Sequence, residues 1–230
     1  MTGVAHLAYR RAIIATCLRM NALGLNQGSS GNVSLRLPEG FLVTPSGLAY
    51  ERMRPAQVVQ MDQEGGYWGE LLPSSEWRLH RDLHRHRPEA RAVLHCHSPH
   101  ATALSCLRRG VPAFHYMVAV AGGDSLRCAD YATFGTAELS TAMLAALEGR
   151  SACLLANHGM ICFAEDLERV LALAVEVETL CRQYLLACQA GAPVLLDAEE
   201  MQRVQERFRS YGRRGAGGAA AVDAVVRRDA

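Results

Sequence analysis

Two histidines separated by one residue, His95 and His97, follow the apolar run 92–94 near the middle of the chain. Such a run is typical of a buried strand, and residues two apart along a strand point to the same side of the sheet. The two imidazoles are therefore expected to face one space, while Cys96 faces the other side. Two imidazoles on one side can bind a metal ion, but zinc takes three or four protein ligands, so the others must come from elsewhere.

The best candidates for the remaining ligands are His158 and Glu76. His158 follows a second apolar run, residues 152–156, and Glu76 stands where a helix is expected to begin. A single histidine is more often an ordinary hydrogen-bonded residue than a ligand, so the hypothesis depends on the His-x-His spacing together with these two partners. The other histidines are expected at the surface or behind the ligands: His6, His80, His84, His86, His100 and His115.

Three short loops of small polar residues, 29–32, 46–47 and 74–75, form a second group of candidate functional residues. Each is next to the end of a predicted strand or the start of a predicted helix. Their hydroxyl groups and unpaired backbone N–H groups, together with a helix N-terminus, can bind an anion such as phosphate. Any one of these loops alone is explained by a turn. Three of them beside a candidate metal site favour a phosphate pocket.

The chain contains no lysine, and this limits the chemistry that it can perform. All 24 of its basic residues are arginines. Schiff-base catalysis and enzyme-bound pyridoxal phosphate both require a lysine amine, so both are excluded. Carbanion chemistry in this chain needs a metal ion or another electron sink.

Length and composition favour a single enzyme-sized domain. The 230 residues are half hydrophobic, the formal net charge is +1, and no internal repeat or composition break marks a boundary. This charge balance argues against nucleic-acid binding. The sequence shows no apolar segment of transmembrane length and no signal peptide, which predicts no membrane partner. Eight scattered cysteines without a CxxC pair are typical of reduced thiols in a cytoplasmic protein.

The predicted helices and strands alternate irregularly, and the first strands form a hairpin. This order fits a single-domain α/β protein, a three-layer α/β/α sandwich around a mixed, largely antiparallel sheet. Strands are predicted at 33–37, 41–44, 58–61, around His95, 114–120, 151–157 and 160–163. Helices are predicted at 4–23, 76–86 with Ser75 as its cap, 99–107, 136–149, 167–190 and 197–209.

Several short motifs, taken in order, resemble the class II aldolase/adducin family. They are Ser30-Gly31-Asn32-Val33-Ser34, Thr44-Pro45-Ser46-Gly47, Pro73-Ser74-Ser75-Glu76, His95-x-His97 and His158-Gly159. The segments 115–117, 121–123 and 131–136 add to the match, which runs from the first helix to Tyr211. Each motif is short, but the ordered set is specific.

The resemblance implies a zinc enzyme and a cyclic homotetramer with active sites between subunits. It places the zinc ion, one per subunit, on Glu76, His95, His97 and His158. It places a substrate phosphate on Asn32, Ser46, Gly47, Ser74 and Ser75. It also implies that Tyr116 acts in proton transfer, that Phe134 lines the aldehyde end, and that Tyr211 reaches a neighbouring subunit's site.

The activity implied by the resemblance is that of a zinc-dependent class II aldehyde-lyase. The substrate would be a ketose 1-phosphate of the L-fuculose 1-phosphate type, and the products dihydroxyacetone phosphate and a short aldehyde. Glu76 would exchange a proton at C3, with Tyr116 as its partner at the C4 oxygen. Residues 1–212 would form the catalytic domain, and the Gly/Ala-rich residues 213–230 a mobile C-terminal tail.

Other activities on the same scaffold stay open. The substrate can instead be 5-deoxyribulose 1-phosphate or 5-(methylthio)ribulose 1-phosphate. A methylthioribulose-1-phosphate dehydratase shares the zinc and a glutamate, whereas sugar-phosphate 4-epimerases of the family have aspartate where Glu76 stands. Non-catalytic, adducin-like assembly domains lack the metal ligands that this chain keeps. Two features depart from the family pattern: Asn157 stands where a second histidine is expected, and the tail after Tyr211 has no counterpart.

Overall fold

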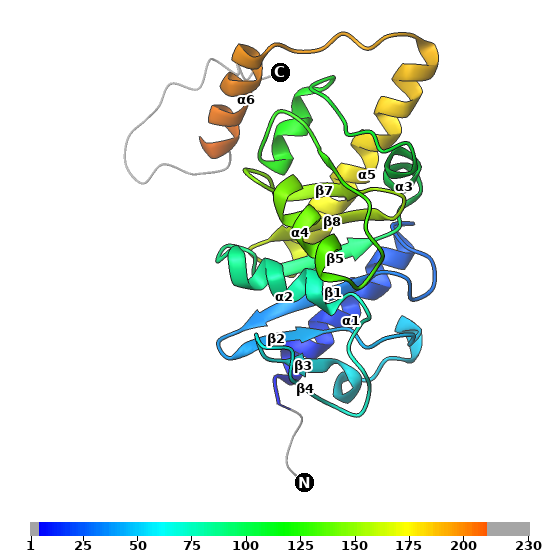
Figure 1. The fold of residues 1–230 in the computed structure, drawn as a ribbon, viewed down its shortest axis with the longest axis vertical. Helices are drawn as coiled ribbons and strands as arrows, with labels where there is room; N and C mark the ends of the chain where they lie inside the picture. Colours follow the sequence, from blue (N-terminus) through cyan, green and yellow to red (C-terminus); the bar gives the residue numbers. More distant parts are fainter. Residues whose placement is uncertain (1–4, 211–230) are drawn as a thin grey trace, which may run out of the picture.

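A computed structural model describes residues 5–210 of the chain and shows one eight-stranded mixed sheet within them. The strand order is β4-β3-β2-β1-β5-β8-β7-β6, and β6 and β7 are the pair that runs parallel (Figure 1). The strands are β1 (Asn32–Leu37), β2 (Gly40–Val43), β3 (Val59–Met61), β4 (Tyr67–Trp68), β5 (Ala92–Cys96), β6 (Cys128–Ala129), β7 (Ala152–Leu155) and β8 (Gly159–Ala164).

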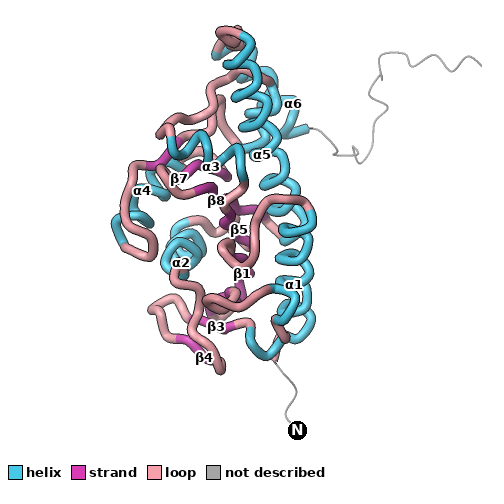
Figure 2. The backbone as a smooth tube through the Cα atoms, turned by 90° about the vertical axis from the view of Figure 1, so that its right-hand side faces the viewer, coloured by secondary structure: helices cyan, strands magenta, loops and turns pink. Residues whose placement is uncertain are grey.

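Helices cover both faces of the sheet, so the predicted three-layer sandwich is confirmed. Figure 2 shows α2 and α4 on one side of the strands and α1 and α5 on the other. Leu79 of α2 and Met143 of α4 pack on Val93 and Phe163 of the sheet, and a larger apolar cluster fills the opposite side. The helices are α1 (Leu7–Ala22), α2 (Trp77–His86), α3 (Pro99–Cys106), α4 (Ala137–Ala146), α5 (Leu167–Ala190) and α6 (Ala198–Ser210).

The register of the central strands places two chemically important residues side by side. The apolar residues of β5, β7 and β8 are buried, as expected of strands covered on both faces. β5 lies between β1 and β8, with His95 opposite Asn32 on one side and opposite Ile161 on the other. The side chains of Asn32 and His95 therefore project from neighbouring positions on adjacent strands.

The prediction of a strand at 114–120 is wrong. This segment contains the 3-10 helix η3 (Tyr116–Ala121), in which the ring of His115 accepts a hydrogen bond from the backbone N–H of Met117. Gly122 ends η3 with φ of 99°, a conformation that favours glycine. A short apolar run fits a strand or one buried helical turn equally well. Here the segment forms the helical turn and packs against α6.

The start of α2 also differs from the prediction. Ser75 is exposed and does not cap the helix; instead the hydroxyl of Ser74 accepts a hydrogen bond from the backbone N–H of Glu76 at 3.3 Å. Glu76 therefore occupies the N-cap position of α2. The two-residue strands β4 and β6 were too short to predict from a pattern.

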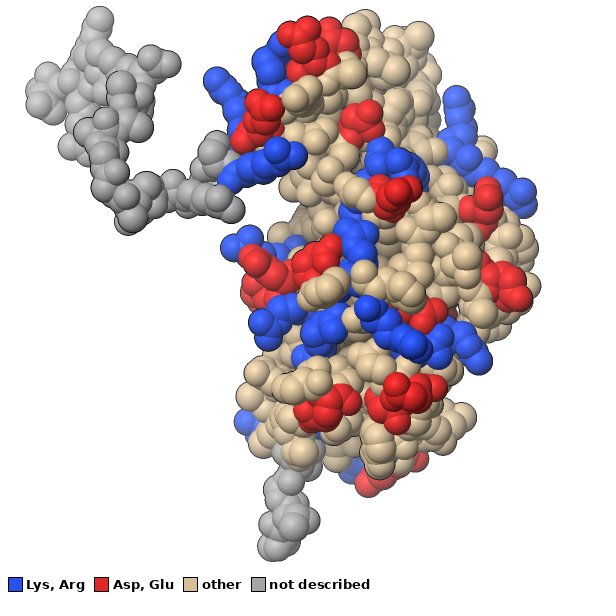
Figure 3. All heavy atoms as spheres, turned by 60° about the vertical axis from the view of Figure 1, so that its left-hand side comes forward, with Lys and Arg blue, Asp and Glu red and all other residues tan. Residues whose placement is uncertain are grey.

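The C-terminal part of the described chain is α6, which packs against η3 at one end of the molecule (Figure 1). Its start agrees with the predicted capping residue, because the Asp197 carboxylate accepts from the backbone N–H of Glu200 at 2.8 Å. Tyr211 and the tail 213–230 lie outside the described residues. Within residues 5–210, no helix is both long and apolar enough to cross a membrane. Basic and acidic side chains are interspersed on the face shown in Figure 3.

Candidate active site

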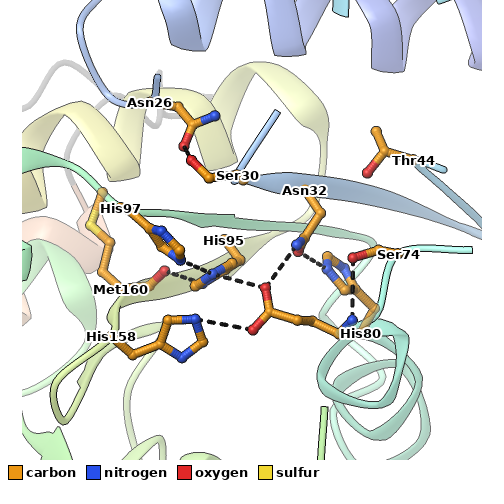
Figure 4. Close-up of polar contacts among 12 residues, drawn as sticks. Asn26, Ser30, Asn32, Thr44, Ser74, His80, His95, His97, His158 and Met160 are labelled. Atoms are coloured by element: carbon orange, nitrogen blue, oxygen red, sulfur yellow. Dashed lines mark hydrogen bonds and ion pairs between the residues drawn. The ribbon is translucent and has the colours of Figure 1, made fainter. Parts of the chain in front are cut away.

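The four candidate metal ligands come from three separate parts of the fold and meet in one place (Figure 4). Glu76 starts α2, His95 and His97 lie at the end of β5, and His158 lies in the β7–β8 turn. One ligand atom from each lies within 4.8 Å of the others. Nε2 of His95 is 3.0 Å from Nε2 of His97, so the two imidazoles share one side of the strand, as the spacing predicts.

The donor atoms fit a tetrahedral divalent metal. Zinc–ligand bonds of about 2.0–2.1 Å place the donor atoms of a tetrahedral site about 3.3 Å apart. Here Glu76 Oε2 is 3.1 Å from Nε2 of His95, and Oε1 is 3.1 Å from Nε2 of His158. Among the described residues, Oε1 is also one of few buried side-chain oxygens without a hydrogen-bond partner. A buried oxygen of this kind is costly unless a donor or a cation satisfies it.

The protonation states of Glu76 and His97 suit metal binding. Burial raises the pKa of Glu76, but the adjacent His95 and His158 outweigh burial and hold this pKa well below its usual range. Burial lowers the pKa of His95, yet the Glu76 carboxylate outweighs it and raises that pKa. Burial and the neighbouring His95 lower the pKa of His97 to about 4. Glu76 is therefore ionised and His97 is neutral at pH 7, so both offer lone pairs.

A backbone contact fixes the tautomer of His95. Its Nδ1 lies 2.9 Å from the carbonyl oxygen of Met160 on β8, which can only accept. Nδ1 therefore carries a proton, and Nε2 faces the other candidate ligands. Metal-binding histidines commonly have a partner of this kind behind the ring, which orients the ring and makes the ligating nitrogen more basic.

The turn that carries His158 is held against α3 and β5. The backbone N–H of Asn157 donates to Ser105 O at 2.9 Å, and that of His158 lies 3.2 Å from Ser105 Oγ. Asn157 adopts φ of 54°, which asparagine tolerates better than most residues. A Cβ on Gly159 would lie 2.5 Å from the carbonyl oxygen of Cys96 and 2.9 Å from the His97 ring, so only glycine fits there.

A cavity of about 290 Å³ opens beside these residues. Its wall includes the candidate metal ligands Glu76, His97 and His158 and the exposed side chain of Phe134, which the family resemblance placed at the aldehyde end. Tyr131, Ala132 and Asn157 complete one side of it and were not singled out as site residues from the sequence. The Nε of Arg108 donates to the Asn157 side-chain oxygen at 3.0 Å behind this side.

Two of the three candidate phosphate loops line this cavity, and the remaining one is joined to them. Pro45 and Pro73 form an isolated β-bridge, and the N–H of Ser46 donates to Leu72 O at 3.0 Å, which joins the second and third loops. The first loop reaches the same cavity, because Ser30 and Ser75 both line it. The exposed Gly47 has φ of 66° and open space at its Cα. Exposed hydroxyl and N–H groups are therefore available around an anion.

Asn32 and Tyr116 occupy positions different from those expected of substrate contacts. Asn32 is buried, its Nδ2 donates to Glu76 Oε2 at 3.0 Å, and its Oδ1 contacts His80 Nε2 at 2.5 Å. Both side-chain atoms are thus occupied within the protein. Tyr116 is half exposed and lines a separate groove between η3 and α6. Within one chain, Tyr116 does not line the cavity around Glu76.

Sequence patterns missed one residue that supports the site. The carboxylate of Glu178, on α5, accepts hydrogen bonds at the start of α3, directly after His97: from the Ser98 hydroxyl and from the backbone N–H groups of His100 and Ala101. No local signal marks Glu178, because α5 is distant in sequence from α3. The weaker histidine candidates lie outside the cluster: His80 and His84 are buried behind it, while His6, His86, His100 and His115 contact other groups.

A model of the family described as the class II aldolase and adducin N-terminal domain matches residues 11–185 of this sequence. The chain belongs to the class II aldolase and adducin family. The metal dependence of class II aldolases agrees with the Glu and His cluster described above.

This class II aldolase is similar to proteins that are named for two kinds of substrate. It is 50% identical over 208 residues to a 5-methylthioribulose-1-phosphate/5-deoxyribulose-1-phosphate aldolase of Rhodospirillum rubrum, over 90% of this chain and 94% of the relative. It is also 50% identical over 206 residues to the L-fuculose phosphate aldolase of Escherichia coli K12, over 89% of this chain and 95% of the relative.

Solved structures agree with the fold and with the assignment as an enzyme. An L-fuculose 1-phosphate aldolase matches with a TM-score of 0.87 and 38% identity, over 91% of this chain and 100% of the other. The prediction of an aldehyde-lyase is therefore confirmed. The alternative of a non-catalytic assembly domain has no support, since these relatives are aldolases.

Proposed function

We propose that this class II aldolase binds one zinc ion on Glu76, His95, His97 and His158. It then cleaves a ketose 1-phosphate to dihydroxyacetone phosphate and a short aldehyde. The observation that carries the proposal is the ionised, buried carboxylate of Glu76 in the wall of the cavity, with His95 and His158 each 3.1 Å from one of its oxygens and His97 beside them. Bound zinc supplies Lewis-acid stabilisation of the negative charge that develops when C3–C4 breaks.

The chain binds the phosphate without any lysine. Ser74, Ser75, Ser46 and Gly47 provide hydroxyl and backbone N–H groups around the substrate phosphate, and the N-terminus of α2 adds a favourable dipole. Asn32 belongs to the same set in the sequence, but its side chain acts through Glu76, since both of its amide atoms have protein partners.

Glu76 and Tyr116 carry the proton transfers. Glu76 moves the proton at C3, which is adjacent to the carbonyl in dihydroxyacetone phosphate. Tyr116 serves the C4 oxygen, and it does so in the site of a neighbouring subunit, because it faces the η3–α6 groove of its own chain. This assignment requires an oligomer, and we propose a homotetramer with active sites between subunits, to which Tyr211 contributes as well. We place the enzyme in the cytoplasm.

The substrate belongs to the ketose 1-phosphates with an apolar far end. Tyr131, Ala132 and Phe134 present rings and a methyl group to the cavity opposite the phosphate loops. L-fuculose 1-phosphate, which ends in a methyl group, is the first candidate because of the similarity to the L-fuculose phosphate aldolase of Escherichia coli K12. The similarity to the Rhodospirillum rubrum aldolase supports a second candidate class, 5-deoxyribulose 1-phosphate and 5-(methylthio)ribulose 1-phosphate.

Turnover of a panel of ketose 1-phosphates tests this proposal. The zinc-loaded enzyme is incubated with L-fuculose 1-phosphate, 5-deoxyribulose 1-phosphate and 5-(methylthio)ribulose 1-phosphate, and dihydroxyacetone phosphate is measured by its enzymatic reduction. We expect release from at least one of them, with kcat/KM ranking the substrates. Loss of water without release of dihydroxyacetone phosphate would indicate a dehydratase, and inversion at C4 an epimerase; either result would replace the proposal.

A further inference from the structure

A continuous chain of buried polar contacts runs away from the carboxylate of Glu76 into the protein interior. Behind the Glu76–Asn32–His80 contacts, Nδ1 of His80 lies 2.7 Å from Ser34 Oγ, which lies 2.8 Å from Nε2 of His84. Nδ1 of His84 ends the chain 2.9 Å from the carbonyl oxygen of Ala90. Figure 4 shows the part of this chain nearest the candidate metal site, with Asn32 between the carboxylate and His80.

Two periodicities bring these residues together. Glu76, His80 and His84 are spaced four apart along α2 and share one face of the helix. Asn32 and Ser34 are two apart on β1 and point to the same side of the strand. Successive residues in the chain of contacts therefore come in turn from the helix and from the strand. None of these positions is explained by packing alone, because an apolar side chain would fill each site at lower cost.

Water does not reach the middle of this chain. Ser34 and His80 have 0% of their surface exposed, His84 has 1% and Asn32 has 4%. A hydrogen bond removed from such a site is not replaced by solvent, so each partner depends on the next. The interior therefore fixes how the amide of Asn32 is presented to Glu76.

The proton positions near Asn32 follow from simple donor and acceptor rules. The Glu76 carboxylate accepts, so the Asn32 amide must turn Nδ2 towards it and Oδ1 towards His80. A carbonyl oxygen accepts, so Nε2 of His80 carries a proton. Burial lowers the pKa of His80 to about 3, which leaves one proton on its ring at pH 7, so Nδ1 accepts from the Ser34 hydroxyl. The ring proton of His84 faces Ala90 O, so Nε2 of His84 is an acceptor as well, and the single Ser34 proton serves one of the two rings at a time.

We propose that His80 is a positioning residue for the reaction at Glu76. Supported by Ser34 and His84, His80 holds the Asn32 amide so that it binds one oxygen of Glu76, while the other oxygen faces His158 and the candidate metal position. If the Asn32 amide turned over, its carbonyl oxygen would face the carboxylate and repel it. The catalytic part of this inference rests on the proposed aldolase function, whereas the orientation of the amide does not.

Three variants separate positioning from a structural role. His80→Leu removes the contacts and keeps much of the volume. His80→Gln keeps a donor for Asn32 Oδ1 and an acceptor for the Ser34 hydroxyl. Ser34→Ala removes the support and leaves Asn32, His80 and Glu76 in place. His86→Leu, at the exposed end of the same helix, is the matched control. If His80→Leu does not fold, Ser34→Ala decides the question.

The kinetic readout is the split between kcat and KM in zinc-loaded enzyme. We expect His80→Leu to lower kcat about 10- to 100-fold with little change in KM, since partners behind a metal ligand typically have effects of this size. Ser34→Ala should lower kcat less, and His80→Gln should restore most of the loss. Wild-type kcat in both His80→Leu and Ser34→Ala would overturn the proposal, and so would a His80→Gln enzyme no better than His80→Leu.

A second readout does not depend on activity. Long-range ¹⁵N–¹H NMR of the metal-free protein reports which ring nitrogen of each histidine carries the proton. We expect the His80 proton on Nε2 in the wild type, and a proton on Nδ1 alone would overturn the proposal. A wild-type enzyme that is inactive on every ketose 1-phosphate would refute the aldolase assignment, and the NMR measurement would still decide the orientation at Asn32.

Discussion

The carboxylate of Glu178 lies 2.6 Å from the hydroxyl of Ser98, the residue that follows the metal-site histidine His97. Through this contact and two backbone N–H groups of α3, a helix from the far end of the sequence holds the end of β5 in place. The position of His97 thus depends on α5 as well as on its own strand.

Replacing Glu178 is expected to destabilise the protein and weaken metal binding together. Glu178→Ala leaves four donors without their charged acceptor, and hydrogen bonds to charged groups are worth about 1.5–3 kcal/mol. We expect the free energy of unfolding of the metal-free protein to fall by about 2 kcal/mol, measured by urea denaturation, and zinc affinity to fall as well. Glu176→Ala, on the same helix, is the control, and equal stability of the two variants would remove Glu178 from this role.

Gly159→Ala tests the close approach of the His158 turn to β5. The added Cβ would lie 2.5 Å from a backbone oxygen, which has little freedom to move. Overpacking of this kind costs about 1–3 kcal/mol, and the resulting shift moves His158 away from the cluster. Zinc affinity, measured by competition with a chelator, should fall. Gly191→Ala, where nothing lies within 4 Å of the new atom, should bind zinc like the wild type.

Ser75→Ala should mainly weaken substrate binding. The exposed Ser75 hydroxyl lines the cavity, and a hydrogen bond to a charged phosphate contributes about 1.5–3 kcal/mol, so KM should rise about 10-fold or more. The interaction is the same in ground and transition states, so kcat should change little. Asn32→Ala should do the opposite and lower kcat more than it raises KM. Steady-state kinetics test this assignment. The same changes in kcat and KM for Ser75→Ala and Asn32→Ala would contradict it.

Glu76→Gln separates the ligand role from the acid/base role. The amide fills the same space but cannot carry the proton. A fully metallated variant should be slowed about 10²–10⁴-fold, the usual contribution of a positioned acid or base. Exchange of the C3 proton of dihydroxyacetone phosphate with solvent, followed by NMR, should slow in parallel and needs no aldehyde. Wild-type exchange in the metallated variant would leave Glu76 as a ligand and make Tyr116 the next candidate for the base.

The buried histidines of α2 predict that the metal-free protein loses stability in acid. Burial lowers the pKa of His84 to about 3, as it does for His80, whereas an unfolded histidine titrates near about 6.5. Between these two pH values the unfolded state binds more protons than the folded state. The stabilising contribution of each histidine is therefore complete above about pH 6.5 and is lost as the pH falls towards 3. Each histidine contributes up to about 1.4 kcal/mol per pH unit. Urea titrations at several pH values should show a smaller dependence of stability on pH for His84→Gln than for the wild type, and an equal dependence in both proteins would contradict this prediction.

The metal cluster was predictable because its signal is local. His95 and His97 lie on the same side because side chains alternate along a strand. His158 follows a second buried strand, which places it near the same edge of the fold. The three-layer arrangement followed in the same way from the order of helices and strands. The segment 114–120 failed because its short apolar run has no period long enough to separate a strand from a helical turn.

The support behind the cluster was not predictable from local patterns. The contact between Asn32 and Glu76 requires the β1–β5 register, and the capping of α3 by Glu178 requires α5 to cross the sheet nearby. The family resemblance and the small polar loop assigned Asn32 to phosphate, and neither of them indicated its side-chain contacts with Glu76 and His80. Tertiary contacts of this kind decide the role of a polar residue and leave no mark on neighbouring positions in the sequence.

The separation of the ligands along the chain has a consequence for how the enzyme acquires its metal. Glu76, His95 and His97 leave the ribosome well before His158, and the β7–β8 turn joins them only when β8 has paired with β5. A nascent chain that ends before β8 therefore offers an incomplete, weakly binding set of ligands. Metal loading therefore follows synthesis of the sheet, and a molecule that has bound metal on all four residues has already completed its central strand pairing.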